Sequence, residues 1–295
     1  RLRRDGHDLR GFARDPTRVA VDVPLVVGDA ISGTGLDDAL DGIDVAYFLI
    51  HSMEPVTAVG GEPRADFGAR ERTAAERFAD AARHAGVERV VYLGGLVPHD
   101  APPSPHLASR LAVERTLLEA LPASTALRAS IVIGAGSRSF RFLVRLIERL
   151  PLVALPAWHV NRTQPVDERD VIEALARAAT STAAAGRSLD VAGPDVVSYG
   201  ELIERIRDLL LLHRPSVRLE RPRWAASGPL ASAVAAAIAG ERRELVEPLM
   251  GGLGSDLLPR DDDWSALLRV RPHSLDAAIE HALGEWERRE PLSAR

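Results

Sequence analysis

Short apolar runs that stop at small polar residues recur along the first half of the chain. The clearest run covers residues 45–50 and is followed at once by a histidine and a serine. A second run covers residues 90–93 and ends in a pair of glycines. Uninterrupted apolar runs of this length are typical of strands that are buried on both faces of a parallel sheet. We therefore expect both strands to end at a ligand-binding edge of such a sheet.

Helical patterns alternate with these runs. Residues 66–86 separate the two strands, and apolar positions with helical spacing follow at 106–121 and 140–150. The pattern also predicts four further strands and a short helical turn: strands at 8–13, 24–28, 125–133 and 188–191, and the turn at 36–40. This alternation predicts an α/β fold with a Rossmann-type, doubly wound parallel sheet.

The second half of the chain carries capping signals for helices. Asp167 is a candidate N-cap, and Ser198 with Glu201 forms a capping box at the start of another helix. Beyond that helix the pattern is helical but irregular. We expect a nucleotide-binding Rossmann domain at 1–160 and a smaller, mostly helical substrate-pocket region at 161–295, partly interleaved with the sheet.

The opening of the chain has a pattern of its own. Residues 1–6 are typical of the end of a helix, with Gly6 as its C-cap, and a strand is expected directly afterwards. A Rossmann fold places a strand and a glycine-rich loop before that helix. The sequence therefore predicts that the first strand and the glycine-rich loop are missing from this chain.

Composition narrows the class of protein. The chain has 295 residues, of which 46% are hydrophobic, so a packed core is expected rather than disorder. A net charge of -5 argues against nucleic acid as a partner. The longest apolar segment, 225–240, is interrupted by Gly228 and Pro229 and is too short for a membrane span. A cytoplasmic location is the default expectation, and the sequence leaves homo-oligomerisation open.

Two familiar kinds of reactive site are absent from the sequence. The chain has no cysteine, which excludes disulfides, thiolate catalysis and cysteine metal ligands. Its nine histidines show no HxxxH or HExxH spacing, so we predict no metal site.

The ends of the first two expected strands carry charged candidates for cofactor binding. Arg14 follows a strand where Rossmann domains read the adenosine ribose, and an arginine there pairs with the 2′-phosphate of NADP. Because Asp15 comes next, a solvated Arg-Asp-Pro turn is the alternative. Asp29 could accept a hydrogen bond from the adenine amino group, or it could cap its loop.

The two apolar strands supply further candidates at their carboxyl ends. Leu49, Ile50, His51 and Ser52 close the first, and His51 would contact a phosphate or ribose or else cap its strand. The second strand is closed by Gly94 and Gly95. Glycine lets a backbone approach a cofactor closely. A tight turn is the alternative for this pair.

A third group of candidates follows the strand expected at 125–133. Ser130 and Gly134 are placed to face the nicotinamide side of a bound cofactor, and Ile131 is a further candidate for cofactor binding. Gln164 lies in a segment that would close a substrate pocket above the sheet, with Leu96 at its boundary. We expect a small organic molecule as the substrate.

Four segments follow one another in a characteristic order: Gly6-His-Asp-Leu-Arg-Gly-Phe-Ala-Arg-Asp-Pro16, Val26-Val-Gly-Asp29, Tyr47-Phe-Leu-Ile-His-Ser-Met53 and Gly86-Val-Glu-Arg-Val-Val-Tyr-Leu-Gly-Gly-Leu96. In this order they resemble the atypical short-chain dehydrogenase/reductases, in particular the NmrA-like and NAD(P)H-binding epimerase-like proteins of bacteria. The resemblance covers roughly residues 1–212. It implies a Rossmann fold and a nicotinamide cofactor, with NADP(H) preferred and NAD(H) open.

The chain departs from that family at its catalytic pair. Active short-chain dehydrogenases use a Tyr-x-x-x-Lys pair, whose spacing here falls on His106 and Arg110. The usual catalytic serine falls on Gly94 or Gly95. His106 is thus a candidate acid/base and Arg110 a candidate ribose or phosphate ligand. The alternative for His106 is an exposed residue at the start of a helix.

Three functions remain open at this stage. The first is an NADP(H)-binding oxidoreductase or epimerase-like enzyme. The second is a non-catalytic NADP(H)-binding redox sensor or assembly subunit, which the altered Tyr-x-x-x-Lys position motivates. The third is a relic of the fold that binds no cofactor.

Overall fold

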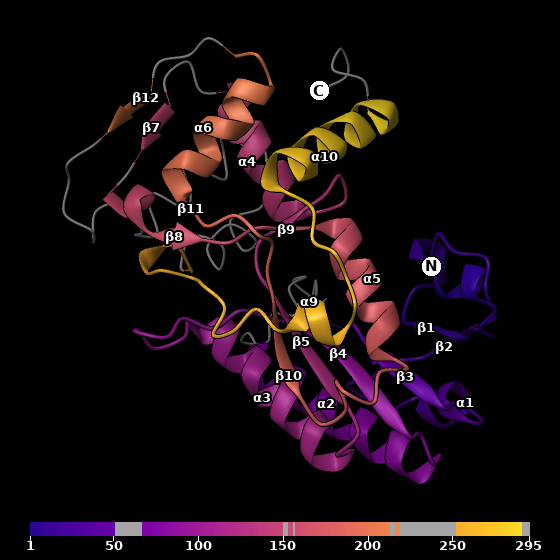
Figure 1. Ribbon diagram of the computed structural model, residues 1–295. Coiled ribbons are helices and arrows are strands. Elements are labelled where there is room, and N and C mark those ends of the chain that lie inside the picture. Colours follow the sequence, from indigo (N-terminus) through magenta and orange to yellow (C-terminus); the bar gives the residue numbers. More distant parts are fainter. Residues whose placement is uncertain (51–66, 150–152, 156, 213–215, 219–251, 291–295) are drawn as a thin grey trace, which may run out of the picture. The chain divides into compact units, whose positions relative to one another are not determined.

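The computed structural model describes residues 1–50, 67–149, 153–155, 157–212, 216–218 and 252–290 (Figure 1). The chain forms two compact units, and each draws on three stretches of sequence. Unit 1 comprises Arg1–Gly95, Pro105–Arg128 and Ile172–Leu189. Unit 2 comprises Leu96–Ser104, Ala129–Val171 and Asp190–Arg295.

The main sheet has four strands in the order β10-β5-β4-β3. Their bounds are Val45–Phe48 for β3, Arg89–Gly95 for β4, Thr125–Ala129 for β5 and Ser188–Val191 for β10. Strands β3 and β4 run parallel in the register Val45↔Arg89 to Phe48↔Tyr92. A separate parallel pair is formed by β1 (Gly11–Ala13) and β2 (Leu25–Val27). The expected α/β class with a Rossmann-like parallel sheet is confirmed.

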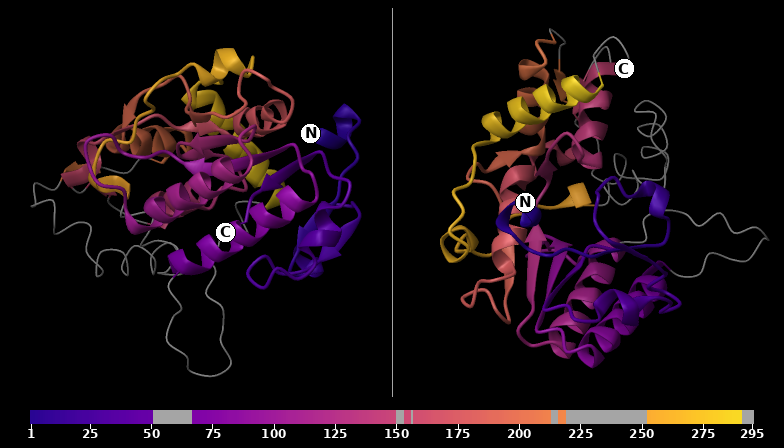
Figure 2. Two further views of the ribbon diagram at one scale, coloured as in Figure 1. Left: turned by 90° about the horizontal axis from the view of Figure 1, so that it is seen from below. Right: turned by 90° about the vertical axis from the view of Figure 1, so that its right-hand side faces the viewer.

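Helices cover both faces of the main sheet in unit 1. Alternating side chains of β3 show this, because Phe48 packs edge-on against Phe78 of α2 with ring centroids 5.0 Å apart. On the opposite face the Tyr47 hydroxyl donates to the carbonyl of Leu175 at 3.2 Å. Figures 1 and 2 show α2 and α3 side by side below the strands. The helices concerned are α1 (Leu36–Leu40), α2 (Phe67–His84), α3 (Pro105–Ala120) and α5 (Glu168–Ala178).

A buried ion pair joins α3 to the main sheet. The Glu114 carboxylate accepts from Arg128 Nε at 3.0 Å and from Arg128 Nη2 at 2.6 Å. It also accepts from Ser188 Oγ at 2.6 Å. Glu114 is only 4% exposed, so these three bonds satisfy a carboxylate that would otherwise be very costly to bury.

The described part of unit 2 is built around three helices, α4 (Arg138–Arg149), α6 (Tyr199–Leu209) and α10 (Leu275–Arg289). They enclose one hydrophobic core that includes Phe140, Leu202 and Trp286. Short strands lie at its edges: β6 (Val132–Ile133) pairs with β9 (Val166–Asp167), β7 (Val153–Leu155) with β12 (Ser216–Arg218), and β8 (Arg162–Thr163) with β11 (Val197–Ser198). The short helices are η1 (Leu2–Asp5), η2 (Pro16–Arg18), η3 (Ala157–Val160), η5 (Gly252–Gly254) and α9 (Trp264–Leu267).

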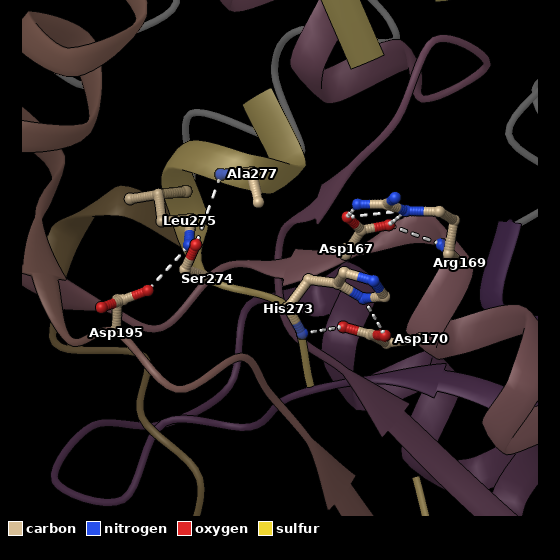
Figure 3. A network of polar contacts seen from close by, with 8 residues as sticks. All are labelled: Asp167, Arg169, Asp170, Asp195, His273, Ser274, Leu275 and Ala277. Atoms are coloured by element: carbon tan, nitrogen blue, oxygen red, sulfur yellow. Dashed lines mark hydrogen bonds and ion pairs between the residues drawn. The ribbon is translucent and has the colours of Figure 1, made fainter. Parts of the chain in front are cut away.

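Two carboxylates of unit 2, Asp170 of α5 and Asp195 of the loop before β11, fix the start of α10 (Figure 3). Asp170 is 2% exposed and accepts from the backbone N–H of His273 at 2.8 Å, with His273 Nδ1 2.7 Å away. Asp195 accepts from the N–H of Leu275, and Ser274 caps the helix through the N–H of Ala277. These bonds satisfy backbone donors that a helix start leaves without partners.

Several expected elements are confirmed and others have different bounds. The turn at 36–40, the strand at 188–191, the left-handed Gly6 cap and the Ser198 capping box are present. The single strand expected at 125–133 is wrong, because it divides into β5 and β6. Ser130 N donates to Val191 O of β10, but Ile131 O already accepts from the N–H of Val166 in β9. The chain therefore changes partners between the two strands.

The segment 225–240 lies outside the described residues. Among the helices that are described, none is both long and apolar enough to cross a bilayer.

Candidate cofactor site

The carboxyl ends of β1 and β2 lie next to each other. Gly28 N donates to Ala13 O at 3.1 Å, which brings Gly28 beside the residue that precedes Arg14. A Cβ on Gly28 would lie 2.2 Å from Thr34 O and 2.5 Å from a ring carbon of Phe12. Only glycine therefore allows the loop 29–34 to fold back at this point.

Asp29 caps the loop that follows β2. Its Oδ1 accepts from Ile31 N at 2.7 Å, and its own N–H donates to Thr34 O at 3.0 Å. One carboxylate oxygen is thus used by the loop, as the second of the two alternatives for Asp29 expects. A contact between the other oxygen and adenine stays a prediction.

Arg14 and Asp15, which follow β1, have different surroundings. Asp15 Oδ1 accepts from both Thr17 N at 3.0 Å and Thr17 Oγ1 at 2.7 Å, as the N-cap of η2. Arg14 is exposed and makes no hydrogen bond or ion pair with any described residue. The bonds from Thr17 hold the pKa of Asp15 below its ordinary value, helped by the charges of Arg18 and Arg14.

The end of β3 is described only in part. Leu49 is 53% exposed just after the strand, and Ile50 packs against the core of unit 1. His51 and Ser52 lie outside the described residues, so their proposed contacts stay predictions.

Gly94 and Gly95 belong to β4, which runs through both of them. The alternative of a tight turn at these glycines is therefore wrong. A Cβ on Gly94 would lie 3.1 Å from Cε1 of Tyr92, two residues earlier on the same face of the strand. A side chain at the position of the usual catalytic serine would press on that ring.

Tyr92 joins β4 to α3 at the candidate catalytic residues. Its hydroxyl donates to the backbone carbonyl of Arg110 at 3.2 Å. His106 and Arg110 are four residues apart on α3 and thus share one helix face, and both are half-buried. Burial raises the pKa of Tyr92 more than the nearby positive charge of Arg110 lowers it. Tyr92 therefore stays protonated and serves as a donor.

Nothing in the sequence singles out Tyr92, because a tyrosine within a buried strand resembles any other core residue. The same holds for Glu71 of α2, which is 4% exposed and accepts from Ser109 Oγ at 2.6 Å. This bond holds α3 against α2 next to Arg110. Only the packing of the two helices brings these residues together.

Leu96, which follows β4, donates its backbone N–H to the carbonyl of Ala129, the last residue of β5, at 3.0 Å, and both residues belong to unit 2. Ser130 follows Ala129 and is 6% exposed. Its hydroxyl has no hydrogen-bond partner among the described residues. Ile131 is half-buried beside it. A buried hydroxyl without a partner is unusual and is consistent with a ligand that supplies one.

Gln164 and Glu168 shape the neighbouring loops of unit 2. Gln164 Nε2 donates to Gly193 O at 2.5 Å, so its amide holds the segment that follows β10. Glu168 was not expected from the sequence. Its Oε2 is buried without a partner in the described part of the chain and lies so close to Gly134 that a Cβ there would be 1.7 Å away.

Comparison with known families now bears on these residues. Residues 1–132 match the family model described as NAD(P)H-binding. The matched segment covers 132 of the 295 residues of the chain. It contains every candidate site residue named above from Arg14 to Ile131, including those at the ends of β1 to β5.

One curated relative of the chain is the mitochondrial NADH dehydrogenase [ubiquinone] 1 alpha subcomplex subunit 9 of Arabidopsis thaliana. It is 28% identical over 138 residues, which cover 46% of this chain. The match spans 34% of the relative, so about two thirds of that protein has no counterpart in the alignment.

Solved structures show the same fold over nearly the whole chain. A short-chain dehydrogenase/reductase superfamily protein from Agrobacterium tumefaciens with bound NAD gives a TM-score of 0.69 at 19% identity. That likeness covers 100% of this chain and 94% of the other. MoeE5 in complex with UDP-glucose and NAD gives 0.68 at 21% identity, covering 98% and 93%. Both structures share the Rossmann-like α/β fold of this chain.

Proposed function

We propose that this protein binds NADP(H) along the carboxyl ends of the parallel strands. The family of residues 1–132 supports a nicotinamide cofactor of either kind. Ligands of open α/β sheets bind outside the carboxyl ends of the strands, where Arg14, Asp29, Leu49, Gly94 and Gly95 lie. His51 and Ser52 belong to the same proposed edge.

The observation that carries the preference for NADP(H) is the contrast between Arg14 and Asp15. The Arg14 guanidinium is exposed and has no partner among the described residues, so it can pair with a 2′-phosphate. The Asp15 carboxylate is turned back onto Thr17. An acidic residue that would favour the 2′-hydroxyl of NAD(H) is thereby engaged elsewhere.

The favoured activity is that of an oxidoreductase or epimerase-like enzyme on a small organic substrate. The cofactor supplies or accepts a hydride at a substrate carbon. His106 gives or takes the proton on the substrate oxygen, because an imidazole titrates near neutral pH. Arg110 holds a ribose or phosphate, and Ser130 and Ile131 line the nicotinamide side.

A second candidate is a non-catalytic NADP(H)-binding subunit. It is favoured by the surroundings of Gly94, where a glycine under the Tyr92 ring stands in for the usual catalytic serine. Tyr92 itself is buried and its hydroxyl already donates to the carbonyl of Arg110, so it does not stand in for the missing acid/base. The curated relative is by name a subunit of a respiratory dehydrogenase, which fits a role in assembly or sensing.

The test is a calorimetric titration of the full chain with NADPH and with NADH, followed by turnover assays on a panel of carbonyl compounds. Micromolar binding that favours NADPH supports the proposed site. Oxidation of NADPH by any compound in the panel supports the enzyme. Binding without oxidation supports the second candidate, and no binding of either nucleotide contradicts both.

A further inference from the structure

The turn after β1 holds two opposite charges next to each other, yet they do not pair. Arg14 and Asp15 are both exposed, and no ion pair joins them. The reason lies one residue beyond Pro16, where Thr17 donates two hydrogen bonds to one oxygen of Asp15. The carboxylate is thus bound to its own turn before any ligand arrives.

The backbone conformation of the turn favours the hydrogen bonds between Asp15 and Thr17. Asp15 has extended dihedral angles, φ -124° and ψ 105°, and Pro16 occupies the first position of η2. Proline fixes its own φ and has no N–H, so the first free backbone donor after Asp15 is that of Thr17. The Thr17 hydroxyl adds a second donor at 2.7 Å from the same oxygen. The side chain of Asp15 is therefore held by the turn and by the hydroxyl together.

Resting on the proposed NADP(H) site, we propose that Thr17 determines the choice of cofactor by holding Asp15 away from Arg14 and from the adenosine ribose. The Thr17 hydroxyl is then a positioning group and does not itself contact the cofactor. If the hydroxyl is absent, Asp15 becomes able to pair with Arg14 or to accept from a 2′-hydroxyl. Both changes favour NADH over NADPH, since a carboxylate repels a 2′-phosphate.

The substitution that tests this is Thr17→Val, which keeps the shape of the side chain and removes the hydroxyl. The measured quantity is the ratio of the Kd for NADH to the Kd for NADPH, determined by calorimetry on the full chain. We expect the ratio to fall about fivefold, which corresponds to about 1 kcal/mol, the usual net contribution of one solvent-exposed hydrogen bond. Thr17→Ser restores the hydroxyl and should restore the ratio of the original protein.

The control repeats Thr17→Val in a protein that carries Asp15→Asn. This second substitution keeps an acceptor for the turn and removes the charge. If Thr17 acts through the carboxylate, Thr17→Val should leave the ratio unchanged in this background. The same fivefold fall with Asn at position 15 would overturn the proposal, because Thr17 would then act directly. An unchanged ratio with Asp15 present would overturn it as well.

A measurement without cofactor separates this proposal from the proposed function. Thr17→Val should raise the pKa of Asp15 toward its ordinary value, which an NMR titration of the free protein follows. If the pKa moves and the original protein binds neither nucleotide, the contact is real but the proposed function is wrong, and the role in cofactor choice falls with it. If the nucleotides bind but the pKa and the ratio stay fixed, only the role of Thr17 is wrong.

Discussion

Adjacent residues of opposite charge play different parts at the end of β1. The side chain of Asp15 is satisfied within its turn, whereas that of Arg14 is left for solvent or a ligand. A list of residue types cannot separate these roles, because both side chains are exposed and sit side by side in the sequence. Only the hydrogen bonds of the turn decide between them.

Arg14→Glu should reverse the cofactor preference. Loss of a charged hydrogen-bond partner for the 2′-phosphate costs about 1.5–3 kcal/mol, or roughly 10- to 100-fold in the Kd for NADPH. The Kd for NADH should change little or improve. Isothermal titration of both nucleotides measures this, with Arg288→Glu on the exposed face of α10 as a charge-matched control. Equal loss for both nucleotides would remove Arg14 from the 2′-phosphate site.

His106→Ala should lower turnover without weakening cofactor binding. General acid/base groups contribute on the order of 100-fold or more to kcat. The assay is steady-state oxidation of NADPH with whichever carbonyl compound proves active, alongside the Kd for NADPH. His84→Ala, at the exposed end of α2, is the control. Full activity of the His106 variant would show that this histidine is only part of the helix surface.

At the level of elements, close approaches of backbone set the geometry of the site. β2 can pass into the loop 29–34 only because Gly28 has no side chain. β4 meets α3 through the Tyr92 hydroxyl, and α3 meets α2 through Ser109. The positions of Arg110 and His106 thus depend on contacts between elements rather than on the catalytic spacing alone.

Gly28→Ala should destabilise the protein by about 1–3 kcal/mol, because the new methyl group would overlap Thr34 O and the Phe12 ring. Urea unfolding followed by tryptophan fluorescence measures the change. Gly254→Ala is the control, since a Cβ there meets nothing within 4 Å. If Gly28→Ala left the free energy of unfolding unchanged, the loop after β2 would be able to move aside, and the position of Asp29 would not be fixed.

Contacts between elements explain which features could be predicted from the sequence and which could not. Apolar periodicity and the Ser198 capping box are local, and both led to correct elements. The division of 125–133 into two strands depends on a partner, Val166, more than thirty residues away. Tyr92 meets Arg110 and Glu71 meets Ser109 likewise through packing between segments that are apart in the sequence. Local patterns carry no information about such contacts.

At the scale of the whole molecule, binding of the cofactor should stabilise the folded protein against unfolding. A ligand that binds only the native state raises the free energy of unfolding by about 2.7 kcal/mol when its free concentration is 100 times its Kd. NADPH should therefore raise the Tm of the full chain in a thermal scan. NADH at the same concentration should raise it less. An unchanged Tm at millimolar NADPH would contradict the proposed site, and the Arg14→Glu variant should lose most of the NADPH effect.

Because the chain alternates between the two units, a single cut cannot separate one unit from the other. The polypeptide passes from one unit to the other after residues 95, 104, 128, 171 and 189. A piece cut where the family match ends, at residue 132, would lack the stretch 172–189, and with it Leu175 and Ser188. Partners of Tyr47 and Glu114 would be lost together. To exchange either unit with that of a relative, three separate stretches of sequence would have to be replaced together. Exchanging the whole chain is therefore simpler than exchanging one unit.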